Sequence, residues 1–119
     1  MAPPRLVYDD DCGFCTWATR VALHYGAFEA VGFSDLTPDQ RARLPDDYER
    51  CAHLLTDDAV YSCGAAAERT LERMVPALAP LFGVCRRSPT YVRFREWLYR
   101  LIADNRDLLG RIRSASPPA

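Results

Sequence analysis

The chain has 119 residues, of which 49% are hydrophobic and 26% are charged, and its formal net charge is −1. The length and composition are those of one ordinary globular domain, and the small net charge argues against a general attraction to nucleic acid or to anionic membranes. No apolar run approaches the roughly 18 residues that span a bilayer. We predict one domain over residues 1–113 and a disordered tail over residues 114–119.

The first predicted elements are a strand, a helix and a second strand. Arg5–Tyr8 is a short apolar run that predicts a buried strand. Residues 14–25 carry apolar side chains at helical spacing, and Gly26 is placed to cap the end of that helix. Residues 28–33 alternate as a strand does, so the two strands should be parallel. The stripe expected to face the core is Trp17, Ala18, Val21, Ala22 and Tyr25.

A capped helix and a hairpin are predicted next. Thr37 can cap a short helix, with Gln40 reaching back to complete a capping box, and this helix should end at Pro45. Two short apolar runs, residues 51–56 and 59–62, are joined by two aspartates and predict a β-hairpin.

The remaining predicted elements are helical. One helix should run from Gly64 to Leu78, with Pro76 and Pro80 kinking or ending its second half. Ser88 caps a final helix, whose stripe runs from Val92 to Asn105. Its apolar stripe is expected to be core: Val92, Phe94, Leu98, Leu101 and Ile102.

The charge is distributed unevenly along the chain. Residues 1–85 carry 7 arginines against 13 acids, whereas residues 86–119 carry 8 arginines against 3 acids. We interpret the second segment as a helix with a solvated basic face, docked beside acidic neighbours. The alternative is a basic surface that binds a partner or an anion.

The order of these elements is β-α-β-α-β-β-α with one extra C-terminal helix, which is the order of a thioredoxin-like fold. It places Cys12 and Cys15, a C-x-x-C pair, where the first strand ends and the first helix begins. Free amide N–H groups and the positive end of the helix dipole meet there and favour a thiolate. The pattern therefore predicts a redox pair.

The cysteine content and the N-terminal sequence also suggest a compartment. The first residues lack a basic patch followed by a long apolar run, so we expect a cytoplasmic protein. Stable structural disulfides are rare there, and five cysteines are an odd number for a fully paired framework. Cys51 and Cys85 are each expected to pack as single thiols, although a third reactive thiol stays open.

The sequence resembles the DCC family of thiol–disulfide oxidoreductases, which have a thioredoxin-like fold. The resemblance rests first on YDDDCGFC, residues 8–15, which matches the family's D-x-x-C-x-x-C motif. It extends to FSDL, LLTDDAVYSCGAAAERTL and YRLIADNRDLLGR, and so covers nearly the whole chain. Asp10 departs from the family's usual Gly, and Cys63 from its usual small polar residue. No proline directly precedes the third predicted strand, where thioredoxins place their cis-proline.

Each residue of the motif receives an expected role. Cys12 is the predicted nucleophile and Cys15 the thiol that resolves the mixed disulfide. Asp9 either relays a proton to or from Cys15 or forms an Asx-type turn. Gly13 and Phe14 shape the turn, and Phe14 presents an apolar patch to the substrate. The neighbouring carboxylates of the motif, Asp10 and Asp11, are expected to face solvent and to oppose thiolate formation on Cys12.

A second predicted site is Ser62, Cys63 and Gly64, at the start of the helix after the hairpin. Glutaredoxins use free N–H groups in the corresponding place to hold a glutathione carboxylate. Ser62 is also a good N-cap whatever the function, so this alternative remains open.

The predicted function is a dithiol–disulfide exchange with a protein or small-molecule substrate such as glutathione, by a monomer that needs no cofactor or metal. Two alternatives remain. One is a dedicated redox partner of a single enzyme. The other is a non-catalytic interaction or metal-binding module, in which Cys12 and Cys15 combine with Cys51 and His53, or with Cys63. Tyr99, Asn105 and Arg106 are expected to pack and cap helices rather than to act in catalysis.

Overall fold

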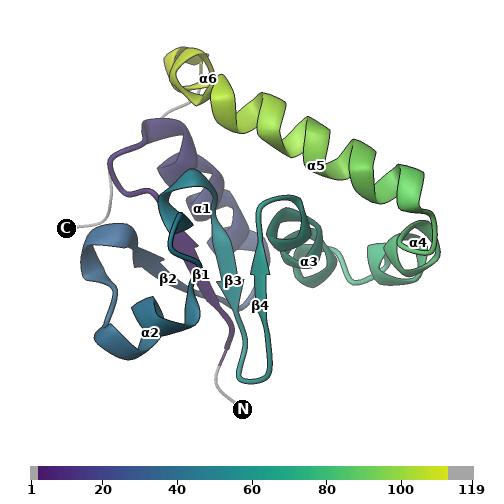
Figure 1. Ribbon diagram of the computed structural model, residues 1–119, viewed down its shortest axis with the longest axis horizontal. Coiled ribbons are helices and arrows are strands. Elements are labelled where there is room, and N and C mark those ends of the chain that lie inside the picture. Colours follow the sequence, from purple (N-terminus) through teal and green to yellow (C-terminus); the bar gives the residue numbers. More distant parts are fainter. Residues whose placement is uncertain (1–2, 113–119) are drawn as a thin grey trace.

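The computed structural model describes residues 3–112, and a four-stranded mixed sheet lies at its centre (Figure 1). The strand order is β2-β1-β3-β4, with β1 parallel to β2 and β3 antiparallel to both β1 and β4. The strands are β1 (Arg5–Tyr8), β2 (Glu29–Gly32), β3 (His53–Leu55) and β4 (Val60–Ser62). With the helices described below, this is the α/β architecture expected of a thioredoxin-like fold.

The helix α1 (Gly13–Tyr25) connects β1 to β2, which confirms the predicted βαβ unit with parallel strands. Cys12 is its N-cap and Gly26 its C-cap. The predicted core stripe is only partly correct, because the buried residues of α1 are Thr16, Thr19 and Ala22. The two threonines tolerate burial because their hydroxyls donate to the carbonyls of Cys12 and Cys15, one turn earlier.

The sheet has an apolar cluster on each face. Leu6 and Val7 are consecutive in β1, so their side chains point to opposite faces. The first cluster is Leu6, Ala22, Leu54 and Ala66, beneath α1 and α3. The second is Val7, Leu44 and Leu55, packed against partly buried residues that include Phe33 and Tyr48.

The segment between β2 and β3 follows the sequence signals closely. The helix α2 (Pro38–Arg43) begins with the predicted capping box, in which Thr37 Oγ1 accepts from the Gln40 N–H at 3.2 Å and Gln40 Oε1 accepts from the Thr37 N–H at 3.0 Å. Short 3₁₀ turns stand on either side, η1 (Phe33–Asp35) and η2 (Tyr48–Arg50). The predicted hairpin is confirmed as β3 and β4.

The helix predicted over residues 64–78 is two helices. The first, α3 (Gly64–Met74), ends before Pro76, which cannot donate a hydrogen bond to a preceding turn. The second, α4 (Leu78–Cys85), accommodates Pro80 in its first turn, where an N–H would have no partner within the helix.

The C-terminal segment contains two helices where we predicted one, α5 (Pro89–Asp104) and α6 (Arg106–Ile112). The predicted N-cap is confirmed, because Ser88 Oγ accepts from the Tyr91 N–H. The prediction that the stripe of α5 is core is wrong: Phe94, Leu98, Leu101 and Ile102 are 54%, 39%, 46% and 41% exposed. Figure 1 shows the reason, since α5 lies beside α3 and away from the sheet, whose face is covered by α1 and α3.

An ionic cluster around Glu68 ties α3 to α5. The Glu68 carboxylate is 3% exposed and accepts from Tyr91 Oη at 2.6 Å, Arg86 Nη1 at 2.9 Å and Arg95 Nη1 at 3.0 Å. Burial alone would raise the pKa of Glu68, but the hydrogen bonds from Tyr91 and Arg86 and the charge of Arg95 hold it below its ordinary value. Part of the basic C-terminal segment is thus docked against acidic neighbours.

Two expectations concern the limits of the chain. Residues 113–119, with the predicted tail, lie outside the described residues, and the single-domain boundary stays a prediction. Within residues 3–112, no helix is both long enough and apolar enough to cross a membrane.

Candidate functional site

The two cysteines of the C-x-x-C pair lie at the start of α1. Cys12 has an extended backbone and caps the helix, and its Sγ accepts from the Cys15 N–H at 3.2 Å. Both thiols are free and partly exposed. The structure therefore brings the predicted pair together at the helix N-terminus, with a backbone N–H directed at the Cys12 sulfur.

The second thiol of the pair sits in a different environment. Burial, together with the neighbouring Cys12, raises the pKa of Cys15 to about 12, while Arg106 acts in the opposite direction. Arg106 Nη1 lies 3.9 Å from Cys15 Sγ and 3.3 Å from Asp9 Oδ2. We expected Arg106 only to pack or cap a helix, so sequence reasoning missed this contact. The available signal was the segment YRLIADNR, which resembles the family's C-terminal segment but gives no indication that it lies near the cysteines.

Asp9 bridges the motif and the C-terminal helix. Its Oδ1 accepts from the Asp11 N–H at 3.0 Å, which confirms the Asx-type turn, and its Oδ2 pairs with Arg106. The proton relay that we considered for Asp9 stays a prediction.

The next two acids differ from each other. Asp11 is exposed as predicted, but Asp10 is only partly exposed and accepts a hydrogen bond from Ser34 Oγ. Asp10 also packs closely over β2, because a Cβ added at Gly32 would lie 2.6 Å from Asp10 Oδ2. Asp10 does not adopt a positive φ, so its replacement of the family's glycine causes no backbone strain of that kind.

An apolar cavity of about 360 Å³ opens beside the pair, between α1, α3 and α5. Phe14 and Trp17 of α1 form part of its wall, which explains why the apolar stripe of this helix is not fully buried by the sheet. Cys15 and Cys51 both line the cavity. So does Thr70, whose buried hydroxyl has no hydrogen-bond partner among the described residues. Gly13 does not line this cavity.

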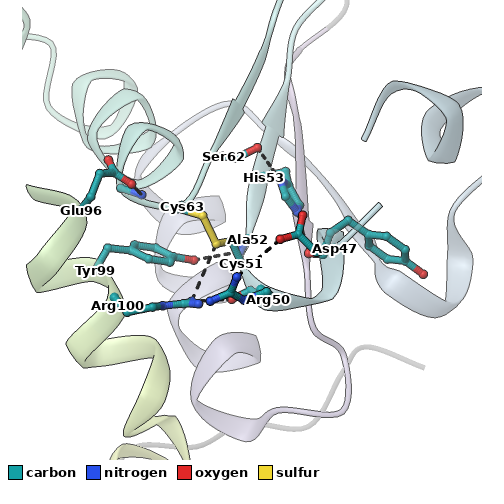
Figure 2. The surroundings of a disulfide bond; sticks show 12 residues. Asp47, Arg50, Cys51, Ala52, His53, Ser62, Cys63, Glu96, Tyr99 and Arg100 are labelled. Atoms are coloured by element: carbon teal, nitrogen blue, oxygen red, sulfur yellow. Dashed lines mark hydrogen bonds and ion pairs between the residues drawn. A yellow bond between two sulfur atoms is a disulfide. The ribbon is translucent and has the colours of Figure 1, made fainter. Parts of the chain in front are cut away.

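The predicted second site has a different structure from the expected one. The N-cap of α3 is Cys63 rather than Ser62, and Ser62 Oγ instead bonds His53 Nδ1 at 2.8 Å (Figure 2). The Gly64 N–H, expected to be free for an anion, donates to Glu96 Oε1 at 3.0 Å. A substrate contact at Ser62, Cys63 and Gly64 stays a prediction.

Cys51 and Cys63 form a disulfide, which corrects our expectation that Cys51 packs as a single thiol (Figure 2). Their Cα atoms are 4.9 Å apart across a sequence separation of 12. The pairing follows from the hairpin, because His53 and Ser62 are register partners and the cysteines stand just outside them. The predicted hairpin was therefore a signal from which this pairing could have been found.

The disulfide is held against α5. Arg100 Nη2 lies 3.8 Å from Cys51 Sγ and donates to the Arg50 carbonyl at 2.7 Å. Tyr99 Oη accepts from the Ala52 N–H at 2.8 Å. Figure 2 shows these two side chains of α5 reaching the segment just before β3.

The side chains that the metal-binding alternative needs as ligands are already engaged with other groups. Cys51 and Cys63 are bonded to each other, and both ring nitrogens of His53 are occupied, Nδ1 by Ser62 Oγ and Nε2 by the Tyr48 carbonyl at 2.7 Å. Within residues 3–112, no group of three or more His, Cys, Asp or Glu side chains is arranged to hold a metal ion. The remaining thiol, Cys85, ends α4 as a partly buried free cysteine.

Comparison with protein families decides the relationship. The model of the DCC1-like thiol-disulfide oxidoreductase family matches residues 6–112. The chain belongs to this family. The DCC1-like match runs from the second residue of β1 to the end of α6 and includes Arg106 and the Cys51–Cys63 hairpin. No curated protein matches the chain. No solved structure matches it either.

Proposed function

We propose that this DCC1-like protein is an enzyme that reduces or forms disulfides through Cys12 and Cys15. The observation that carries the proposal is the asymmetry of the pair. Cys12 caps α1 and receives a backbone N–H, whereas burial raises the pKa of Cys15 to about 12. One sulfur thus receives a backbone hydrogen bond at the helix N-terminus, and the other is held as a thiol until it is needed.

The first step uses Cys12. Its thiolate attacks one sulfur of a substrate disulfide, the substrate S–S bond breaks, and the other substrate sulfur leaves as a thiolate that takes up a proton. Cys12 is then joined to the remaining substrate half. Phe14 and the apolar cavity offer a surface for the carbon chain next to that sulfur, and Gly13, the first residue of α1, shapes the turn between the two cysteines.

The second step uses Cys15. After losing its proton, Cys15 attacks Cys12 Sγ, the mixed disulfide breaks, and the second substrate thiol is released. The substrate gains two electrons and two protons, and the protein is left with a Cys12–Cys15 disulfide. Arg106 stabilises the Cys15 thiolate, and Asp9 orients Arg106 and is positioned to take part in the proton transfer.

The proposal includes the setting of the reaction. The substrate is a protein or small-molecule disulfide, with glutathione as the simplest test compound, and Ser62, Cys63 and Gly64 form its outer contact. The enzyme acts as a cytoplasmic monomer without an organic cofactor. The dedicated redox partner of one enzyme is the more restricted form of the same function.

A redox titration tests the proposal. Purified Cys85→Ser protein is equilibrated in glutathione buffers of graded potential, its free thiols are alkylated, and the alkylated peptides are identified by mass. We expect Cys12 and Cys15 to lose their alkylation together as one two-electron couple. If the two cysteines stay reduced at every potential, the proposed function is wrong.

Arg106 provides a second test. Without its positive charge the pKa of Cys15 rises further, and each unit lowers the thiolate fraction tenfold. We expect Arg106→Gln to slow the resolving step about tenfold at neutral pH, with the pH profile of that step moved to higher pH. Arg106→Lys should restore part of the rate. Arg111→Gln, on the exposed side of the same helix, is the matched control, and equal rates for both glutamine variants would contradict this role.

A further inference from the structure

The Cys51–Cys63 disulfide shares a cavity with the C-x-x-C pair. Cys51 and Cys15 both line the space of about 360 Å³ between α1, α3 and α5. Tyr99 lies on the same wall, and its hydroxyl accepts from the Ala52 N–H, next to Cys51. Tyr99 and Cys15 therefore line the same cavity, and Tyr99 also holds the residue that follows Cys51.

The surroundings of the disulfide favour its opening. The Arg100 guanidinium lies 3.8 Å from Cys51 Sγ and would stabilise a Cys51 thiolate. Cys63 has a φ of 57°, in the region that side chains other than glycine rarely adopt. The disulfide thus includes a residue in a strained backbone conformation, and such residues cluster at functional sites. In a cytoplasmic protein, moreover, disulfides are usually transient ones that take part in redox chemistry.

We propose that Cys51 and Cys63 form a second redox pair, which passes electrons to Cys12 and Cys15 through a Cys15–Cys51 mixed disulfide. This inference rests on the proposed function of the first pair. The transfer starts from a state in which an external dithiol has reduced Cys51 and Cys63 and a substrate disulfide has oxidised Cys12 and Cys15.

The transfer then takes two exchange steps. The Cys51 thiolate attacks Cys15 Sγ, a Cys15–Cys51 bond forms, and Cys12 leaves as a thiolate stabilised by the Cys15 N–H. The Cys63 thiolate next attacks Cys51 Sγ, which closes Cys51–Cys63 and releases Cys15. Two electrons and two protons pass from one pair to the other, and Cys15 ends as a buried thiol.

Trapping the intermediate tests the geometry. In a Cys85→Ser background, the pair of substitutions Cys12→Ser and Cys63→Ser leaves only Cys15 and Cys51. Mild oxidation with diamide should join these two within one chain, as identified by peptide mass without reduction. The matched control, Cys12→Ser with Cys51→Ser, leaves Cys15 and Cys63 and should give at least tenfold less of its cross-link. Equal yields, or cross-links only between chains, would overturn the proposal.

Stoichiometry tests the electron flow and separates this proposal from the function on which it rests. Cys85→Ser protein is reduced with dithiothreitol, freed from it, and mixed with excess oxidised glutathione. We expect each chain to reduce two equivalents of oxidised glutathione. The variant with Cys51→Ser and Cys63→Ser should reduce one equivalent. With Cys12→Ser and Cys15→Ser, the remaining pair should react at least tenfold more slowly than the intact protein.

The contrary outcomes are distinct. One equivalent from the intact protein means that Cys51–Cys63 is inert and only the second pair is refuted. If the variant with Cys51→Ser and Cys63→Ser is folded by circular dichroism but reduces no oxidised glutathione, the proposed function is refuted instead. Fast reaction of the protein that lacks Cys12 and Cys15 shows that Cys51 and Cys63 act without the transfer.

Discussion

Replacing Cys12 by serine is expected to reduce the rate of disulfide reduction by a factor on the order of 10³ or more, as loss of a catalytic nucleophile does elsewhere. The serine hydroxyl retains the N-cap, since its oxygen can accept the same N–H, but it is not a nucleophile for sulfur at neutral pH. The measurement is the release of glutathione from oxidised glutathione by pre-reduced protein. Cys85→Ser, which changes a free cysteine outside the pair, serves as the control and should retain the full rate.

The companion substitution separates the two sulfurs. Cys15→Ser should leave the first step intact and accumulate protein whose Cys12 carries one glutathione, a mass increase visible in the whole protein. If Cys15→Ser gave no adduct while Cys12→Ser did, the assignment of nucleophile and resolving thiol would have to be reversed.

The second large effect is expected on stability, at Glu68. This carboxylate is 3% exposed and joins Tyr91, Arg86 and Arg95. Glu68→Ala removes the common partner of two partly buried guanidinium groups, and breaking buried pairs of this kind costs about 3–5 kcal/mol. We expect a loss near the lower value, about 3 kcal/mol, because Arg86 keeps Glu72 and Arg95 keeps Glu96. Urea unfolding at pH 7 measures it.

The loss of stability in Glu68→Ala has a matched control and an expected dependence on pH. Glu49→Gln changes an exposed carboxylate and should alter the free energy of unfolding by no more than about 0.5 kcal/mol. Because the folded pKa of Glu68 lies below its ordinary value of 4.5, its contribution is present above about pH 4.5 and is lost as the pH falls through the folded pKa. The difference between wild type and Glu68→Ala should therefore shrink in acid. A difference that is constant from pH 7 to pH 3 would contradict the charged role of Glu68.

The elements that could be predicted are those that depend on local signals. The spacing of Cys12 and Cys15, the capping box at Thr37 and the N-cap at Ser88 each involve residues within one helical turn, and each is confirmed. The parallel pairing of β1 and β2 also follows locally, because a strand–helix–strand connection in one sheet permits little else.

The apolar face of α5 shows what periodicity cannot supply. The spacing of Phe94, Leu98 and Ile102 correctly places them on one helix, but it says nothing about whether another element covers that face. Here the sheet is already covered by α1 and α3, so the stripe of α5 lines the open cavity in part and is otherwise exposed.

In the candidate site, too, the contacts that could not be predicted are those that depend on tertiary structure. The disulfide could not be chosen from five cysteines without the register of β3 and β4, which places Cys51 and Cys63 at the two ends of one hairpin. Arg106 could not be selected from fifteen arginines, because its contact with Cys15 depends on where α5 ends and how α6 returns to α1.

That contact joins residues 91 positions apart, and it sets an order of events during synthesis. At about 5–20 residues per second, a ribosome needs roughly 5 to 20 seconds to proceed from the codon of Cys15 to that of Arg106. Throughout this interval the nascent chain carries both cysteines of the pair without the guanidinium and without the helix that completes the cavity wall. The cysteines are made well before their environment is finished, so a newly made chain acquires its native thiol chemistry only after Arg106 has been synthesised.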